Sequence, residues 1–421
     1  MCGQKKIIIV GAGLAGLCTA YYLIKKGFSV EVVDKNTSVA LGASYANGGL
    51  LTPSMSEPWN SPGILFQLLK YLGDSGAPML LKPRYLHNYI RWGMKFLANS
   101  NKNQFSHSTI QNMKLSMYSM SKLHELRGNL GLEYESKREG TLKIFRQKKS
   151  FEQAIKHSSM LTEKGLKLEI LSPKEVEKVE PILNEVSSTL CGGIFYPEDE
   201  IGNAKLFCEQ LSVHIIRLGG KIRLDTNVQK IIVNSGTVNG VLTDKGTIDC
   251  SQIVVAGGAW TSELLKNIGV SLSIKPVKGY SLSVPMNNQI TLPTKAILDD
   301  DLHAAITPLG SSIRLAGTAE FSGWNDNIDS KRIDNLWNFF RTITPSLYEQ
   351  SRVESAEQWC GFRPMSADGL PYIGRTFIEG VFVNSGHGPL GWSQAAGSAH
   401  LISQVVAGCP TSIEIDSFAV R

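Results

Sequence analysis

The sequence predicts an α/β protein. A helix-flanked, parallel sheet is expected from both ends of the chain, with a largely antiparallel β plus helix domain inserted between them. An apolar run from Lys5 to Val10 passes through a glycine-rich turn into a helical pattern and a second strand at 29–33, which is a βαβ opening. A strand, a glycine-rich turn and a helix also close the chain at 381–406. The length of 421 residues allows two domains.

The elements between these ends follow from local patterns. Residues 140–145 and 192–196 read as strands, and Ser172-Pro-Lys-Glu175 is a capping box that starts a short helix. A helix is expected at 203–218. Further expected elements are short strands over 221–255, strands over 275–320, a polar helix at 330–341, a last strand at 381–384 and a closing helix through Val406.

Composition and spacing exclude several kinds of protein. The net charge of +6 is modest, and no basic and aromatic motif predicts a nucleic-acid partner. The seven cysteines never form Cys-x-x-Cys, and no histidine pair has metal-ligand spacing, so neither disulfides nor a metal site is expected. This cysteine usage suits a reducing, cytoplasmic compartment. We expect no signal peptide, and the glycines within 7–24 argue against a membrane span there.

The turn after the first strand has the Gly-x-Gly-x-x-Gly spacing of a dinucleotide-binding loop. Its glycines permit a tight turn, close approach of a pyrophosphate and close helix packing, and the helix N-terminus offers free N–H groups to phosphate. An aspartate at the end of the second strand is placed to bind ribose and disfavours NADP, while NAD and FAD stay open. The cofactor-binding residues expected here are Gly11, Ala12, Gly13, Leu14, Ala15, Gly16, Asp34 and Lys35.

Two more glycine-rich segments extend this Rossmann-like site. Residues 42–49 predict a second close backbone approach, with a flexible surface loop as the alternative. Residues 386–391 precede a helix whose first N–H groups would stabilise the negative charge of a reduced flavin, which favours FAD; a packed helix start is the alternative. The expected cofactor-binding residues are Ser44, Asn47, Gly48, Gly49, Leu50, Gly388, Pro389, Leu390, Gly391 and Trp392, with Val228, Gly257 and Trp260 from the middle of the chain.

Five segments, in the same order from about residue 5 to about residue 406, resemble the D-amino-acid oxidase superfamily of FAD-dependent oxidoreductases. Within it the chain is most similar to the small subunits of bacterial D-amino-acid dehydrogenases. The segments are Gly-Ala-Gly-Leu-Ala-Gly at 11–16, Ser-Tyr-Ala-Asn-Gly-Gly at 44–49, Val-Lys-Gly-Tyr-Ser-Leu-Ser at 277–283, Gly-Phe-Arg-Pro-Met-Ser-Ala-Asp-Gly-Leu-Pro at 361–371 and Gly-His-Gly-Pro-Leu-Gly-Trp at 386–392.

The resemblance implies that FAD accepts a hydride at N5 from Cα of a D-amino acid. The imino acid then hydrolyses to a 2-oxo acid and ammonia, and the electrons pass to a quinone or another acceptor. FAD is expected to be non-covalent, because Gly361 rather than Cys360 matches the position where some relatives link it. A secondary-amine enzyme (D-hydroxyproline dehydrogenase, or glycine or sarcosine oxidase) and a non-enzymatic FAD-binding subunit are the alternatives.

The resemblance assigns the substrate carboxylate to Arg363, whose planar guanidinium can bind it bidentately. A structural ion pair with Asp368 is the alternative. Tyr280 is expected to turn its hydroxyl into the pocket or to serve as a core tyrosine. His303 and Tyr196 are weaker pocket candidates with structural roles as the alternative, and a structural role is also favoured for a histidine within 386–391.

Residues 70–128 contain nine Lys and Arg against two acidic residues. A helix there carries an apolar face made of Leu86, Tyr89, Ile90, Met94 and Leu97. One interpretation is peripheral contact of 63–128 with the inner face of the cytoplasmic membrane, near a quinone. The other is an ordinary helical subdomain. The expected domain parts are FAD-binding at 1–90, 202–262 and 359–421, with helical and substrate parts at 91–201 and 263–358.

Overall fold

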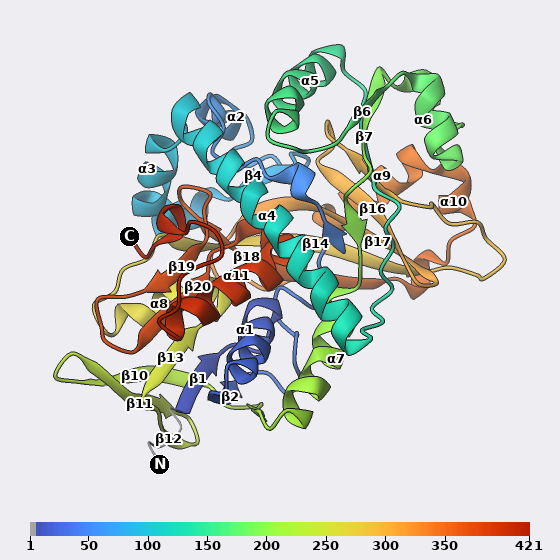
Figure 1. The fold of residues 1–421 in the computed structure, drawn as a ribbon. Helices are drawn as coiled ribbons and strands as arrows, with labels where there is room; N and C mark the ends of the chain where they lie inside the picture. The colour runs from blue at the N-terminus through green and yellow to red at the C-terminus, as the bar shows by residue number, and fades with distance from the viewer. Residues whose placement is uncertain (1–5) are drawn as a thin grey trace.

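The computed structural model describes residues 6–421, so Cys2 and the predicted start of the first strand at Lys5 lie outside the described residues. Figure 1 shows two main sheets joined by long connections. The first has the strand order β19-β20-β13-β1-β2-β9 and is parallel except at β19. Its strands are β1 (Lys6–Val10), β2 (Ser29–Val33), β9 (Lys221–Arg223), β13 (Gln252–Val255), β19 (Tyr372–Arg375) and β20 (Val381–Ser385).

Helices cover one face of this sheet, and a small antiparallel sheet covers the other. The helical side forms the largest apolar core, around strands and helices from both chain ends. The helices are α1 (Leu14–Lys25), α4 (Lys102–Leu130), α7 (Ala204–Arg217) and α11 (Gly391–Val406), and the small sheet holds β10 (Val228–Asn234), β11 (Thr237–Thr243) and β12 (Gly246–Asp249). Because β1 pairs with β13 and β13 with β20, the two ends of the chain build one layer.

The second sheet is largely antiparallel and follows the order β18-β14-β17-β16-β15-β5-β7-β6, with β4 beside β17. Its strands are β4 (Met79–Leu81), β5 (Thr141–Phe145), β6 (Glu169–Leu171), β7 (Gly192–Tyr196), β14 (Ile274–Pro285), β15 (Ala296–Asp299), β16 (Ala304–Leu309), β17 (Ser312–Phe321) and β18 (Glu357–Ser366). The helices α6 (Pro173–Val179), α9 (Ser330–Ile343) and α10 (Pro345–Glu349) contribute to its core, and β3 (Leu50–Leu51) pairs with β8 (Glu200–Ile201). The predicted α/β fold class is confirmed, while the domain boundaries stay a prediction.

Most predicted elements form where the local signals put them. The capping box at Ser172 starts α6, Asn203 caps α7 through the N–H of Leu206, and Gly27 follows α1 at φ +87°. The predicted helical face at 86–97 differs: residues 83–89 form a 3₁₀ turn, and α3 (Ile90–Ala98) buries Trp92 and Phe96.

The face of α3 that carries Ile90, Met94 and Leu97 is therefore exposed. The remaining α-helices of the described chain are α2 (Ile64–Lys70), α5 (Lys148–Thr162) and α8 (Thr261–Lys266). None of the described helices is long and apolar enough to cross a membrane.

The long helix α4 packs on α11 through a glycine. A Cβ built on Gly397 would lie 2.7 Å from Cβ and 2.8 Å from Cα of Ser119, closer than atoms approach without a shift. Ser119 Oγ also accepts a hydrogen bond from the Gly397 N–H at 3.0 Å. The closing helix is therefore held against α4 at a distance that only glycine allows.

We expect Gly397→Ala to destabilise the protein by about 1–3 kcal/mol through overpacking. The matched control is Gly128→Ala on the exposed side of α4, where a Cβ would meet nothing within 4 Å. This control should stabilise the protein by up to about 1 kcal/mol, because alanine favours the helix. Thermal unfolding followed by circular dichroism measures both changes, and equal melting temperatures for the two variants would contradict the packing described here.

Candidate active site

A cavity of about 1340 Å³ lies between the two sheets. Its wall begins at the carboxyl ends of β1 and β2, passes the starts of α1 and α11, and reaches β14, β17 and β18 of the second sheet. Pockets for one small ligand usually span about 300–1,000 Å³. The cavity is thus large enough for a dinucleotide cofactor together with a small substrate.

The glycine loop at the start of α1 forms one end of the cavity. A Cβ on Gly16 would lie 1.8 Å from the carbonyl oxygen of Gly11, and Gly11 itself has φ +111°. Asp34 Oδ2 accepts a hydrogen bond from the N–H of Ala12 at 2.7 Å, and the N–H of Leu14 donates to Ser44 Oγ at 3.2 Å. These contacts fix the turn so that the N-terminus of α1 faces the cavity.

The second glycine-rich segment is held by strands of the antiparallel sheet. Arg314 Nη1 donates to the carbonyl oxygen of Asn47 at 2.8 Å, and Thr307 Oγ1 donates to that of Gly48 at 2.8 Å. Residues 42–50 are therefore anchored between the sheets, unlike a flexible surface loop. Their small side chains let the backbone itself form part of the wall.

Most residues expected to bind the cofactor line this cavity. Lys35 lies with its Nζ 3.7 Å from the ring centroid of Trp260. Ala12, Gly16, Gly49 and Leu390 do not line the cavity; Gly16 and Gly49 pack closely against neighbouring segments, and Ala12 and Leu390 are buried. The expected residues in the wall are Gly11, Gly13, Leu14, Ala15, Asp34, Lys35, Ser44, Asn47, Gly48, Leu50, Val228, Gly257, Trp260, Arg363, Gly388, Pro389, Gly391 and Trp392.

The start of α11 forms another part of the wall. Among the described residues, the N-cap residues Gly13 of α1 and Leu390 of α11 make no side-chain hydrogen bond to the first turn, and Ser44 satisfies only the Leu14 N–H of α1. Such ends favour phosphate at α1 and the negative charge of a reduced flavin ring at α11. The side chains and backbone present therefore fit FAD. His387 adjoins this turn and is buried, and its Nε2 has no hydrogen-bond partner among residues 6–421. Burial lowers the pKa of His387 to about 4 and keeps its imidazole neutral.

Arg363 projects from β18 into the cavity wall without an acidic partner among the described residues. Its Nη1 donates to the carbonyl oxygen of Thr318 at 3.1 Å. Burial lowers the pKa of Arg363 to about 10, so it is still charged at pH 7. Asp368, the partner considered from sequence, instead pairs with Arg421 at 2.5 Å.

Two neighbours fix where this guanidinium lies. A Cβ on Gly279 would fall 2.0 Å from Arg363 Nη1, so the glycine leaves the space that the arginine fills. The ring of Trp59 lies 5.7 Å from the guanidinium carbon, within range of a cation–π contact. The charge is thus positioned before any ligand arrives.

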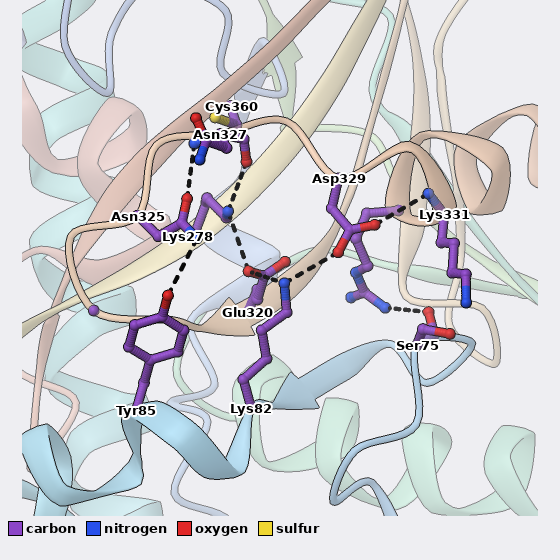
Figure 2. Close-up of polar contacts among 12 residues, drawn as sticks. Ser75, Lys82, Tyr85, Lys278, Glu320, Asn325, Asn327, Asp329, Lys331 and Cys360 are labelled. Atoms are coloured by element: carbon purple, nitrogen blue, oxygen red, sulfur yellow. Dashed lines mark hydrogen bonds and ion pairs between the residues drawn. The ribbon is translucent and has the colours of Figure 1, made fainter.

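The ring of Tyr280 lines the cavity, but its hydroxyl is committed to a buried carboxylate. It donates to Glu320 Oε2 at 2.6 Å. Figure 2 shows Lys82 and Lys278 on the same carboxylate, at 3.0 and 3.1 Å, with Asp329 beside Lys82. Burial and the Glu320 carboxylate both raise the pKa of Tyr280, so its phenol stays neutral and can only accept a hydrogen bond from the cavity side.

The weaker candidates occupy a polar part of the wall. His303 has φ +50°, and burial lowers its pKa. Its charged neighbours are Asp299, Asp301 and the pair formed by Asp300 and Lys143 at 2.5 Å. The Tyr196 hydroxyl lies 3.2 Å from Ser158 Oγ. The sequence reasoning missed Trp59, Thr318 and Ser54 in the wall, and no local motif marks them.

Comparisons with known proteins agree with this geometry. The model of the family described as FAD dependent oxidoreductase matches residues 6–405. The chain is 35% identical to a D-amino acid dehydrogenase of Vibrio vulnificus over 403 residues, which is 96% of each chain. It is also 35% identical to a D-amino acid dehydrogenase of Rhizobium rhizogenes over 415 residues, 99% of each.

Solved structures show the same fold at lower identity. Glycine oxidase from Geobacillus kaustophilus matches with a TM-score of 0.78 and 21% identity, covering 99% of both chains. L-proline dehydrogenase from P. horikoshii matches with a TM-score of 0.78 and 16% identity, covering 99% of this chain and 96% of that one. With the family model spanning nearly its whole length, this chain belongs to the FAD-dependent oxidoreductases of the D-amino-acid oxidase type.

Proposed function

We propose that this protein oxidises D-amino acids to 2-oxo acids and ammonia. The electrons pass through FAD to a quinone or another acceptor. The observation that carries the proposal is Arg363, a charged side chain held in the cavity wall without an acidic partner among the described residues. A buried cation of this kind is stabilised by an anionic ligand. Relatives named D-amino acid dehydrogenase over the full length support an amino-acid carboxylate as that anion.

The chain's own residues bind and orient the substrate. Arg363 binds the carboxylate, and its fixed position beside Trp59 sets where Cα lies. Bound FAD supplies the acceptor for the hydride that leaves Cα. No Asp, Glu or His needs to take the Cα proton in this chemistry, which suits a wall where His387 is neutral and Tyr280 keeps its proton.

Two other functions are tested by one experiment. A secondary-amine enzyme is one alternative, since L-proline dehydrogenase has the same fold. A non-enzymatic FAD-binding subunit is the other, and such a subunit would not need a buried cation that binds a carboxylate. Anaerobic mixing with D-amino acids, L-amino acids and cyclic imino acids, followed by flavin bleaching, separates these functions. We expect the fastest bleaching with D-amino acids; bleaching by secondary amines alone, or by none of them, would overturn the proposal.

The pure protein is expected to be yellow and to release intact FAD on heating. The reason is that Gly361 lies in the cavity wall, while the neighbouring Cys360 thiol donates to the carbonyl oxygen of Asp326 at 3.1 Å. The absorbance spectrum before denaturation and after filtration of the heated protein measures this. Flavin that stays with the precipitated chain would show a covalent link.

Arg363→Ala is expected to lower kcat/KM for a D-amino acid at least tenfold, about 1.4 kcal/mol or more of transition-state stabilisation. Arg363→Lys should recover part of the loss, because it keeps the charge but not the bidentate geometry. Gly279→Ala should resemble Arg363→Ala, since the new Cβ displaces the guanidinium. Steady-state kinetics on protein with full FAD content checks this, and unchanged kinetics would remove Arg363 from the site.

We also propose that the surface formed by α2 and α3 contacts the anionic lipids on the inner face of the cytoplasmic membrane, where a quinone would accept the electrons. The apolar patch consists of side chains on α2, the turn after it and α3, of which Phe66 is 79% exposed: Leu65, Phe66, Leu69, Leu72, Ile90, Met94 and Leu97. Around it lie the exposed cations Lys70, Arg84, Arg91 and Lys95, and 63–97 contains a single acidic residue, Asp74. Ile64 and Gln67, on the same helix, line the cavity, so the patch adjoins the site.

The wild-type protein should sediment with phosphatidylglycerol vesicles and less with phosphatidylcholine vesicles, because cations near an anionic surface add to apolar burial. The double variant Phe66→Glu with Leu69→Glu should lose this binding while keeping activity with a water-borne dye as acceptor. Ile216→Glu on α7, which Figure 1 places at the opposite end of the molecule, is the matched control and should bind like wild type. Equal binding by all three proteins would contradict the contact.

A further inference from the structure

A buried carboxyl group lies directly behind the cavity wall, and the function proposed above does not use it. Asp199, between β7 and β8, is 1% exposed. Its carboxylate accepts hydrogen bonds from Ser54 Oγ at 2.5 Å, from the Ser54 N–H at 3.3 Å and from Thr141 Oγ1 at 2.6 Å. In the part of the chain that the structure describes, no cation pairs with it.

The hydrogen bond to Asp199 determines what Ser54 can offer to a ligand. Ser54 lines the cavity, and its hydroxyl proton is directed to the carboxylate. A hydroxyl whose proton is committed can only accept a further hydrogen bond. Ser54 therefore presents an acceptor to the cavity, which fits the N–H group of an amine and not a carboxylate.

Ser54 lies on a segment that joins the cofactor end of the cavity to Arg363. The N–H of Thr52 donates to Ser393 Oγ, in the first turn of α11, at 2.9 Å. Five residues beyond Ser54, the ring of Trp59 lies against the Arg363 guanidinium. Ser54 Oγ, the hydrogen-bond acceptor, thus lies on a segment between the start of α11, which suits the flavin, and Arg363, which suits the carboxylate.

We propose that Ser54 and Asp199 bind the substrate's amino group and remove its ammonium proton. This inference rests on the proposed oxidation of amino acids. With the carboxylate on Arg363, one N–H of the ammonium group binds Ser54 Oγ. The ammonium proton passes to Ser54 Oγ while the Ser54 proton passes to Asp199 Oδ2, which leaves a neutral amine, an intact serine and a protonated Asp199. The neutral amine has the lone pair that the departure of hydride from Cα requires.

The surroundings of Asp199 suit a group that takes up a proton near neutral pH. Burial raises the pKa of Asp199 to about 7 against the opposing hydrogen bonds from Ser54 and Thr141. Glu198 adds to the rise in the pKa of Asp199, and Asp199 in turn raises the pKa of the Tyr196 phenol on β7. The remaining charged groups on the packed elements, Lys143 on β5 and Glu57 beyond residues 53–55, act on Tyr196. Since the ionised carboxylate is the proton acceptor, activity is present above pH 7 and is lost as pH falls through it.

The first test separates amine recognition from carboxylate recognition. Ser54→Ala should lower kcat/KM for D-alanine at least tenfold, yet leave the Kd of propionate, which lacks the amino group, within twofold of wild type by flavin absorbance. Ser56→Ala is the matched control: Ser56 is buried in the same segment, and its hydroxyl donates to the carbonyl oxygen of Pro53. It should change neither quantity. Loss of propionate binding in Ser54→Ala, or full D-alanine activity, would overturn the proposal.

The second test uses the pH profile, which a merely structural carboxyl group would not change. Wild-type kcat/KM for D-alanine should rise with a midpoint near pH 7. Asp199→Asn, which keeps the shape and can still hydrogen-bond Ser54, should lose this midpoint and at least tenfold of kcat at pH 8 with unchanged FAD content. The hydrogen bond from Thr141 holds the pKa of Asp199 down. Thr141→Val removes this bond and should therefore move the midpoint to higher pH.

The outcomes distinguish this inference from the proposed function. If D-amino acids bleach the wild-type flavin and Asp199→Asn keeps the wild-type midpoint, the proton-acceptor role is wrong while amino-acid oxidation stands. If no D-amino acid bleaches the wild-type flavin, both fail together.

Discussion

Arg363 carries a positive charge into the interior of the protein, where no acidic side chain of the described chain pairs with it. Among the described residues its one hydrogen bond goes to the carbonyl oxygen of Thr318, and Gly279 on the adjacent strand leaves the space for it. An uncompensated buried charge costs several kcal/mol unless a ligand offsets it. The antiparallel sheet therefore holds an unpaired cation, and the proposal places its anionic partner in the cavity in front of it.

The parallel sheet supplies the other half of the site. β1 lies between β2 and β13, and β20 joins β13, so helices from both chain ends start at the same edge. The starts of α1 and α11 then face one cavity, opposite β14 and β18. Because the last strands of the chain complete the sheet, both chain ends must be folded before the starts of α1 and α11 can line one cavity. The two halves of the candidate site are thereby brought together by the pairing of distant segments rather than by any single motif.

Sequence patterns predicted the parts of this site that depend on local geometry. The glycine loop, the capped helices and the closing helix follow from turn and cap chemistry within a few residues, and the resemblance pointed to Arg363. The contact between Ser54 and Asp199 joins residues 145 positions apart, and Tyr280 meets Glu320 only because β14 pairs with β17. The burial of Trp92 and the exposure of Met94 on α3 likewise depend on what the helix packs against, which periodicity alone does not state.

The most direct measurement of the central claim is an experimental structure of the FAD-loaded protein with propionate bound. The account predicts the propionate carboxylate against the Arg363 guanidinium at about 2.7–2.9 Å, between Trp59 and the start of α11. A carboxylate bound elsewhere in the cavity, with Arg363 still bonded only to the Thr318 carbonyl oxygen, would contradict it.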